Sequence, residues 1–286
     1  MILVTGASGN IGRELVRRLS DRKLVFRAGY RAPSKAADLP GLEPVPFDLA
    51  RPDTVRAALS GVDRAFLLSP DGEQKIALES AFAEEAKRQG VRHIVKLSSW
   101  RGTGEAHAFA RANHAVEKVI QALGLPYTFL RPNYFMQNAI TFFAASIKAH
   151  GTFSFPSNGA RACQIDVRDI AEVAMRTLTE AGHEGQVYEM SGPESLSFEE
   201  VAQKISAATG KTVKYVDVSI EELRRSTREA GASEWHVEAL GDFARFLQAG
   251  GSAALTDTVQ RLTGKLPIRH DQFARDHADA FRTAER

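Results

Sequence analysis

The chain opens with three glycines spaced three residues apart. Gly6, Gly9 and Gly12 lie in "MILVTGASGNIGRELVRRL", after a short apolar run and before a helical pattern. In such a turn the first glycine permits the sharp bend, the second removes the Cβ that would hold a pyrophosphate away, and the third lets the helix pack closely. Backbone N–H groups and the positive end of the helix dipole then face the phosphates. The motif, placed at the first strand, predicts dinucleotide binding.

The end of the second predicted strand carries basic residues. Proteins that bind NAD usually place an acidic residue there, roughly 20 residues beyond the glycines, to hold the ribose 2′-hydroxyl. The segment "AGYRAPSK" instead contains Arg31 and Lys35, and no Asp or Glu occurs between Leu24 and Ala37. A guanidinium group can bind a phosphate through two hydrogen bonds, and an ammonium group adds a second positive charge. The alternative is two solvated surface cations; the pattern favours NADP(H) over NAD(H).

Composition excludes several classes of protein. The 37 Lys and Arg residues against 35 Asp and Glu give a formal charge of +2, which argues against a dedicated nucleic-acid-binding protein. No apolar run reaches the roughly 20 residues that span a bilayer, and the N-terminus lacks the features of a signal peptide. Cys163 is the one cysteine, which excludes a disulfide framework and a cysteine-based zinc cluster. We expect a cytoplasmic protein without a nucleic-acid partner, a membrane partner or a metal.

Short apolar runs alternate with amphipathic helices through the N-terminal part of the chain. Each predicted strand ends in a polar or glycine-containing turn, which is typical of a doubly wound parallel α/β sheet, the Rossmann arrangement. The segment 133–151 predicts a helix, and helices dominate after residue 197. We therefore expect an NADP(H)-binding domain over 1–132 and 162–191, and a smaller, mostly helical lobe over 133–161 and 192–286.

Several short motifs together resemble one known family. They are "TGASGNIG", "FDL", "KLSS", "GLPYTFLRPNYFMQN" and "DVRDIAEVA", spread over nearly the whole chain. They resemble the NmrA-like group of atypical short-chain dehydrogenases. That group includes NADPH-dependent quinone, azo-dye and triphenylmethane-dye reductases, and also redox-sensing regulators. The resemblance implies a Rossmann protein that binds NAD(P), and it does not fix the substrate.

The resemblance also implies which residues contact the cofactor. Beside Arg31 and Lys35 at the 2′-phosphate, those at the pyrophosphate would be Ser8, Asn10 and Ile11. Those beside the adenine and its ribose would be Asp48, Leu49, Leu68, Ser69 and Pro70. Those toward the nicotinamide would be Ser98, Ser99, Pro132, Asn133, Tyr134 and Phe135.

A predicted helix from about residue 105 to 123 lacks the usual catalytic pair. Better-known short-chain dehydrogenases carry Tyr-x-x-x-Lys here, but the residue four before Lys118 is His114. The resemblance points one residue earlier, to Asn113, where several relatives have His or Lys. Helical geometry places Asn113 at the edge of the apolar arc and His114 and Lys118 on nearly the opposite side. We therefore favour Asn113 over His114 near the nicotinamide, and keep both as catalytic candidates.

Aromatic residues cluster in sequence around the expected opening between the lobes. The set, counted with one methionine, is Trp100, Tyr134, Phe135, Met136, Phe142, Phe143, Phe153 and Phe155. Most are expected to be core residues, and helical spacing alone predicts this for Phe135 and Phe142. Trp100, Tyr134, Phe135 and Phe142 are also candidates to line a substrate site. Such a lining would suit a flat, hydrophobic molecule better than a sugar nucleotide.

The sequence thus favours an NADPH-dependent oxidoreductase that transfers hydride to a planar, electron-poor small-molecule acceptor such as a quinone or a dye. Such an acceptor can take its final proton from solvent, so the missing tyrosine is tolerable. The alternative is a non-catalytic NADP(H)-binding redox sensor that acts through a protein partner. A sugar-nucleotide epimerase or dehydratase is disfavoured by the absent Tyr-x-x-x-Lys. Fold alone does not separate these functions.

Overall fold

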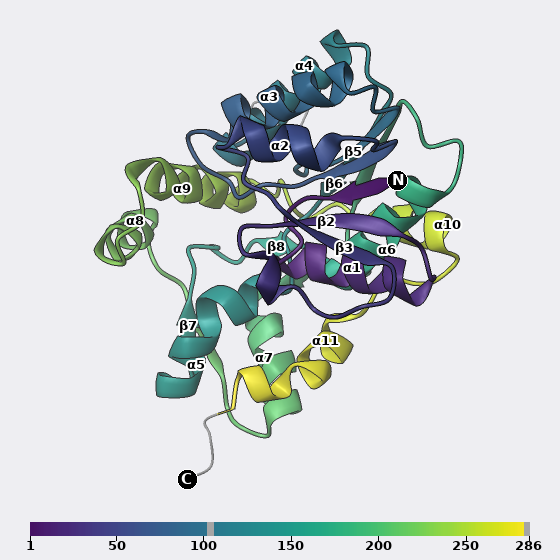
Figure 1. Cartoon of the computed structure of the whole chain (residues 1–286). Helices are drawn as coiled ribbons and strands as arrows, with labels where there is room; N and C mark the ends of the chain where they lie inside the picture. Colours follow the sequence, from purple (N-terminus) through teal and green to yellow (C-terminus); the bar gives the residue numbers. More distant parts are fainter. Residues whose placement is uncertain (102–105, 283–286) are drawn as a thin grey trace. The chain divides into compact units, whose positions relative to one another are not determined.

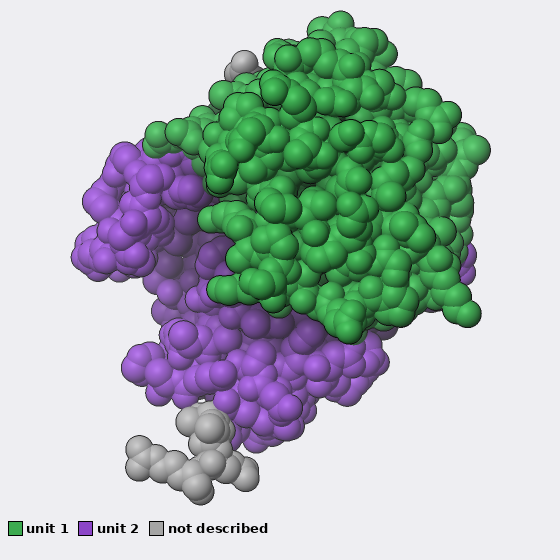
Figure 2. Space-filling model, viewed as in Figure 1, with its two compact units in different colours: residues 1–104, 110–132, 167–189 green, residues 105–109, 133–166, 190–286 purple. Residues whose placement is uncertain are grey.

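A computed structural model describes residues 1–101 and 106–282 of the chain. The chain divides into two compact units, coloured separately in Figure 2. Unit 1 comprises residues 1–104, 110–132 and 167–189, and unit 2 comprises residues 105–109, 133–166 and 190–286. The sequence led us to expect this domain over 1–132 and 162–191; the last segment of unit 1 instead spans 167–189, and residues 105–109 belong to unit 2.

Unit 1 is built on a seven-stranded sheet with the order β3-β2-β1-β4-β5-β6-β9. The pairs β1–β2, β2–β3, β1–β4, β4–β5 and β5–β6 are parallel. This is the doubly wound arrangement that the alternating pattern predicts. The strands are β1 (Ile2–Val4), β2 (Phe26–Tyr30), β3 (Leu42–Pro46), β4 (Arg64–Leu67), β5 (His93–Leu97), β6 (Tyr127–Pro132) and β9 (Gln186–Met190).

Helices cover both faces of this sheet (Figure 1). One face carries α1 (Asn10–Asp21) and α6 (Val167–Thr179), joined by an Arg18–Glu172 ion pair of 2.9 Å. The other carries α2 (Pro52–Leu59), α3 (Lys75–Arg88) and α4 (Ala108–Ala122). Their apolar sides share one buried cluster with the sheet, which includes Phe82, Val116 and Phe129. Burial of these continuous apolar faces fixes the helices against the strands.

Unit 2 combines helices with two short two-stranded sheets. The strand pairs are β7 (Thr152–Ser154) with β11 (Lys214–Val216), which is parallel, and β8 (Arg161–Ala162) with β10 (Leu196–Ser197), which is antiparallel. Its core is rich in aromatic side chains, among them Phe153 and Phe198. The α-helices are α5 (Ala144–His150), α7 (Phe198–Thr209), α8 (Ile220–Glu229), α9 (Glu234–Gln248), α10 (Thr258–Thr263) and α11 (His270–Asp276), and 3₁₀ turns cover Pro33–Lys35 in unit 1 and Ala278–Ala280 in unit 2.

The helix expected over 133–151 begins later than predicted. Residues up to 137 form a bend and turn, and a π-helical turn over Ala139–Phe143 leads into α5. Phe135 forms a β-bridge with Ile165, and the Met136 N–H donates to the Ile165 carbonyl oxygen at 2.9 Å. These long-range bonds hold the start of the segment extended, against its helical periodicity. The start of the helix predicted from about residue 105 lies outside the described residues, and α4 begins at Ala108.

Candidate functional site

The glycine loop between β1 and α1 is too crowded for larger residues at two of its three positions. Gly6 has φ +63°, which favours glycine. A Cβ on Gly12 would lie 2.1 Å from the Gly6 carbonyl oxygen. At Gly9, φ is −79° and a Cβ would lie 3.3 Å from that same oxygen. The fold therefore tolerates a small side chain at this position better than at Gly6 or Gly12. These distances agree with the steric roles expected for the first and third glycines.

The loop lies where the order of the strands changes direction. The chain passes from β1 to β2 on one side and reaches β4 on the other. In open α/β sheets, ligands bind outside the carboxyl ends of the strands at this point. Thr5 joins the two strand ends, because its hydroxyl lies 3.0 Å from the Phe66 and Leu68 carbonyl oxygens and accepts the Leu68 N–H at 2.8 Å.

The tip of the loop is exposed, whereas its base is buried. Ser8, Gly9 and Asn10 are exposed, and Ile11 and Gly12 are buried at the start of α1. The Asn10 side chain accepts a hydrogen bond of 3.2 Å from Arg13. The backbone at the beginning of α1 is therefore accessible to an anion, which the helix N-terminus attracts.

Arg31 and Lys35 are both exposed beyond the end of β2. Lys35 closes a 3₁₀ turn over Pro33–Lys35. Within residues 1–101 and 106–282, neither side chain forms an ion pair or a hydrogen bond with another side chain. Both cations are consequently available to an external anion.

The other residues expected beside the adenosine lie after β3 and β4. Asp48 is half-buried, and its carboxylate accepts the Ala50 N–H at 3.0 Å, so it also shapes its own turn. Leu49 packs against the unit 1 core. After β4, Leu68 is half-buried, Ser69 is buried and Pro70 is exposed.

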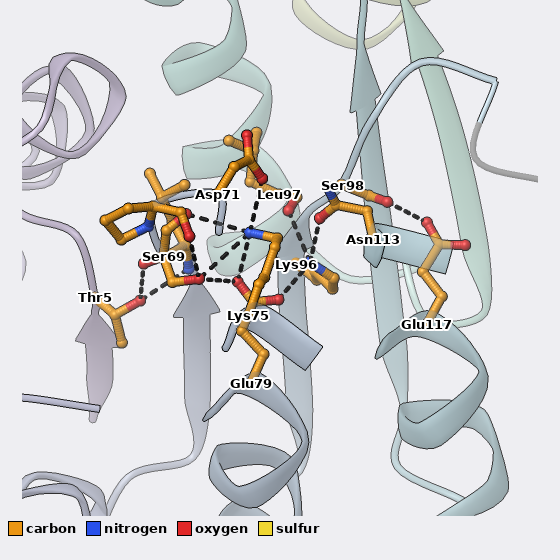
Figure 3. A network of polar contacts seen from close by, with 12 residues as sticks. Thr5, Ser69, Asp71, Lys75, Glu79, Lys96, Leu97, Ser98, Asn113 and Glu117 are labelled. Atoms are coloured by element: carbon orange, nitrogen blue, oxygen red, sulfur yellow. Dashed lines mark hydrogen bonds and ion pairs between the residues drawn. The ribbon is translucent and has the colours of Figure 1, made fainter. Parts of the chain in front are cut away.

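A buried ionic network extends from the end of β4 to α4 (Figure 3). Lys75, at the start of α3, lies 3.0 Å from the Glu79 carboxylate, and Lys96 in β5 lies 2.6 Å from the same carboxylate. Ser69 donates to Glu79 at 2.6 Å. Lys96 also donates to the Asn113 side-chain oxygen at 2.8 Å. The three charged groups are buried, with exposures of 4%, 0% and 0% for Lys75, Glu79 and Lys96.

These charged groups shift one another's pKa values. Burial acts to raise the pKa of Glu79, but the Lys96 and Lys75 ammonium groups outweigh it and lower that pKa. Burial lowers the pKa of Lys96, while Glu79 opposes this shift. For Lys75 the carboxylates of Glu79 and Asp71 prevail over burial and raise the pKa. The charged state of Glu79 is therefore stabilised by two cations.

The structure separates the three candidates on α4. Asn113 is buried at 4% exposure and contacts Lys96. Lys118 is exposed, as expected. His114 does not simply face water: its side chain is one-quarter exposed, and its Nδ1 lies 3.5 Å from the Glu117 carboxylate. The next turn of the helix brings Glu117 back toward the sheet, which explains this contact.

A second buried group surrounds Ser98 at the end of β5. The Ser98 hydroxyl donates to Glu117 at 2.5 Å, and Arg131 in β6 donates to both Glu117 carboxylate oxygens. Arg131 also lies 3.5 Å from Glu189. Burial acts to raise the pKa of Glu117, but hydrogen bonds from Arg131 and Ser98 lower it. The proton of the Ser98 hydroxyl is thus engaged by Glu117.

The remaining site candidates are distributed over both units. In unit 1, Trp100 is buried and its backbone N–H donates to the Pro132 carbonyl oxygen at 3.1 Å. Ser99 is half-buried. In unit 2, Asn133 donates to the Ser252 carbonyl oxygen at 2.9 Å.

The aromatic candidates of unit 2 differ in their surroundings. Tyr134 packs on the aromatic core and stacks on Phe243, with 5.6 Å between ring centroids. Phe135 is half-buried, and Phe142 is 64% exposed. The core position that helical spacing predicts for Phe142 is therefore wrong, because this residue lies in a π-helical turn with a different period. Met136, Phe143, Phe153 and Phe155 are core residues, which the sequence led us to expect for most of this set.

Sequence reasoning missed the charged residues near the carboxyl ends of the strands. They are Lys75, Glu79, Lys96, Glu117 and Arg131. Two signals were present. Lys96 interrupts the apolar run "HIVKL", and Lys75 and Glu79 have the i, i+4 spacing of an ion pair on a helix. Neither signal shows that the charges meet, because that requires the strand order.

The fold and the loop define a dinucleotide-binding α/β protein of the doubly wound type. The chain belongs to the NmrA-like family, whose model matches residues 1–257. It is 35% identical to an NAD(P)H azoreductase from Xenophilus azovorans, over 99% of this chain and 100% of that protein. It is 26% identical to quinone oxidoreductase 2 from Escherichia coli, over 92% and 94% of the two chains.

A solved structure supports the same assignment. The NADPH complex of the Escherichia coli quinone oxidoreductase QOR2 superimposes with a TM-score of 0.86 at 25% identity, covering 96% of this chain and 98% of that one. Within the described ranges, no helix has both the length and the apolar character needed to cross a membrane. Nor do three or more His, Cys, Asp or Glu residues of those ranges form a cluster that could hold a metal ion.

The loop geometry predicts different effects for two glycine substitutions, one mainly on stability and the other mainly on NADPH binding. Gly12→Ala should lower the free energy of unfolding by about 3 kcal/mol, because its Cβ would overlap backbone atoms. Gly9→Ala should cost less than about 1 kcal/mol but weaken NADPH binding, because its Cβ would occupy the space that a phosphate approaches. Urea unfolding and NADPH titration measure the two effects. A stable Gly9→Ala protein with unchanged NADPH affinity would contradict this role for the loop.

The ionic network predicts a stability change that depends on pH. Glu79→Gln should lower the free energy of unfolding at neutral pH by roughly 3–5 kcal/mol, because it leaves buried cations without their carboxylate. The folded-state pKa of Glu79 is lowered, so its contribution is complete above the ordinary value near 4.5 and is lost as the pH falls below it. Unfolding curves should therefore show a smaller acid-induced loss in Glu79→Gln than in the unmodified protein.

A matched control is Glu43→Gln, which removes the exposed carboxylate of an ion pair with Arg27, while Arg27 keeps its bonds to the Ala58 and Ser60 carbonyl oxygens. It should change stability by less than about 1 kcal/mol. Equal effects of the two substitutions would show that burial of the Glu79 network adds nothing.

Proposed function

We propose that this protein is an NADPH-dependent reductase that delivers hydride to a planar, electron-poor acceptor such as a quinone, an azo dye or a triphenylmethane dye. The observation that carries the proposal is the glycine loop at the strand-order switch, with an accessible helix N-terminus. The azoreductase and quinone oxidoreductase relatives support this reaction class, because they cover nearly the whole chain.

The residues present suit a bound dinucleotide phosphate. The loop backbone and α1 would hold the pyrophosphate, and Arg31 with Lys35 would hold the 2′-phosphate. When bound, the reduced nicotinamide supplies the hydride. In doubly wound proteins a dinucleotide lies across the switch, so with the adenosine beside the residues after β2, β3 and β4 the reacting half would lie toward the end of β5. Ser98 and Asn113 lie at that edge and would orient the bound groups.

The experiment that tests the function is NADPH oxidation with a panel of quinones, azo dyes and triphenylmethane dyes. Acceptor-dependent loss of NADPH absorbance is the expected result, and Gly9→Ala, with weaker NADPH binding, should reduce it. Tight NADPH binding without turnover of any acceptor would refute the reductase proposal and favour a sensing role.

Cofactor choice depends on the two cations after β2. Arg31→Asp should weaken NADPH binding about 100-fold, because it replaces a charge-assisted phosphate contact by a repelling carboxylate. NADH binding should change by less than about threefold, since NADH lacks that phosphate. Titration of both cofactors measures the difference.

Arg88→Asp is the control, because Arg88 is an exposed cation in the last turn of α3, away from the end of β2. It should alter neither affinity. If Arg31→Asp weakens NADPH and NADH equally, Arg31 does not bind the 2′-phosphate.

A further inference from the structure

The turn between β7 and β8 contains the one Asn-Gly pair of the sequence. Asn158 and Gly159 are both exposed, and their φ angles are +48° and +71°. The Ala160 N–H donates to the Ser157 carbonyl oxygen at 2.9 Å and closes the turn. Two positive φ angles inside such a turn define type I′, which favours asparagine followed by glycine. The local geometry therefore explains why this pair occurs here.

An aspartate holds this turn in place. Because β7 and β11 are parallel, Asp217, the residue after β11, lies beside the segment that follows β7. Its carboxylate accepts the Ser157 N–H at 2.9 Å, the Asn158 N–H at 3.1 Å and the Tyr215 hydroxyl at 2.6 Å. Burial acts to raise the pKa of Asp217, but hydrogen bonds from Tyr215 and the two backbone N–H groups lower it. Asn158 thus has a negatively charged carboxylate as its neighbour.

Two groups that can react with each other are both unbonded at this turn. Within residues 1–101 and 106–282, neither the Asn158 side-chain amide nor the Gly159 N–H forms a hydrogen bond with another protein group. A Cβ built on Gly159 would meet nothing within 4 Å, so no neighbouring atom shields this backbone. A peptide nitrogen that follows asparagine can attack the side-chain amide carbon. Glycine hinders this attack least, because it has no side chain.

The other asparagines of the chain lack this combination. Asn113 and Asn133 are buried, and Asn138 is half-buried directly before the π-helical turn. Asn10 is exposed, but the next residue is the buried, β-branched Ile11 in the first turn of α1. A branched side chain on the following residue hinders attack by its nitrogen. Asn10 therefore provides an internal comparison for an exposed asparagine without a glycine after it.

We propose that Asn158 is a site of spontaneous deamidation, and that the bonds between Asp217 and the turn set its rate. The Gly159 nitrogen loses its proton and forms a bond with Asn158 Cγ, ammonia leaves, and a succinimide ring results. Water then opens the ring at either carbonyl, which gives aspartate or isoaspartate. Nothing is oxidised or reduced, and water is the co-reactant. The inference is independent of the proposed function, because neither cofactor nor acceptor takes part.

The bonds to Asp217 oppose ring closure. The peptide between Asn158 and Gly159 must rotate out of the type I′ geometry before the nitrogen reaches Cγ, and Asp217 stabilises that geometry. Each product carries a new carboxylate beside Asp217, and isoaspartate also lengthens the backbone. Like charges repel, so Asp217 should hold the modified turn less tightly. The turn thus slows the reaction and is weakened by its product.

Mass spectrometry of peptides from the full chain, aged in mildly alkaline buffer, tests this inference. The peptide with Asn158 should gain the mass of an amide-to-acid exchange and become a substrate of isoaspartyl methyltransferase. The peptide with Asn10 should stay intact over the same period. Asp217→Ala should speed the reaction at Asn158 roughly fivefold or more, because it removes hydrogen bonds that hold the turn. Asp217→Asn, which keeps an acceptor oxygen, should speed it less.

The matched control is Asp279→Ala. Asp279 is also an aspartate of unit 2, with its side chain 97% exposed and paired with Arg282. Its replacement should leave the rate at Asn158 unchanged. A second control is a synthetic peptide of residues 152–162, which has the same sequence without the bonds to Asp217 and should deamidate faster than the folded chain.

Stability gives the second readout. Asn158→Asp, which reproduces one product, should raise the unfolding equilibrium constant about threefold in urea titrations, and by less when Asp217→Asn has removed the neighbouring charge. Equal effects in both backgrounds would contradict repulsion by Asp217.

Two results would overturn the inference. One is an Asn158 peptide that stays as intact as the Asn10 peptide while the synthetic peptide deamidates. The other is a rate at Asn158 that is the same in the unmodified chain, Asp217→Asn and Asp217→Ala, because Asp217 would then have no influence on the reaction.

Discussion

The close approach of α1 to the turn after β1 constrains everything around it. The Gly12 backbone lies so near the Gly6 carbonyl oxygen that a β-carbon would reach within 2.1 Å of it. Only this approach brings the helix N-terminus to the edge of the sheet where β1 and β4 diverge. Parallel strands then bring their carboxyl ends to the same edge, so Thr5, Ser69 and Ser98 gather there although they are distant in sequence.

Buried ion pairs beneath that edge organise the ends of β4 and β5, next to which we propose that NADPH binds. Glu79 holds Lys75 and Lys96, and Glu117 holds Ser98 and Arg131. Buried charges of this kind are costly unless every group is paired, so the arrangement has little freedom to rearrange. Such rigidity is what a hydride-transfer site needs, because rate depends on holding the reacting groups in position. Rigid positioning would also allow hydride transfer without the catalytic tyrosine that other short-chain dehydrogenases carry.

The sequence was sufficient for the fold and the loop because their signals are local. Alternation of apolar runs and amphipathic helices predicted the sheet, and the glycine spacing predicted the turn. Helical periodicity also distinguished Asn113 from Lys118. It failed for the start of the segment 133–151, where pairing of Phe135 with Ile165 overrides the helical pattern. It could not show the Lys96 network, because three elements contribute to it and only the strand order brings them together.

The most direct test of the central claim is transfer of deuterium from NADPH labelled at one or the other C4 position. The acceptor should take hydride at carbon, as a triphenylmethane dye does, so that the label does not exchange with water. Mass spectrometry of the reduced dye should show deuterium from one of the two labelled cofactors and not from the other, because a site that holds the nicotinamide presents one face to the acceptor. Absence of deuterium from both products, or equal transfer from both cofactors, would contradict direct hydride transfer in this protein.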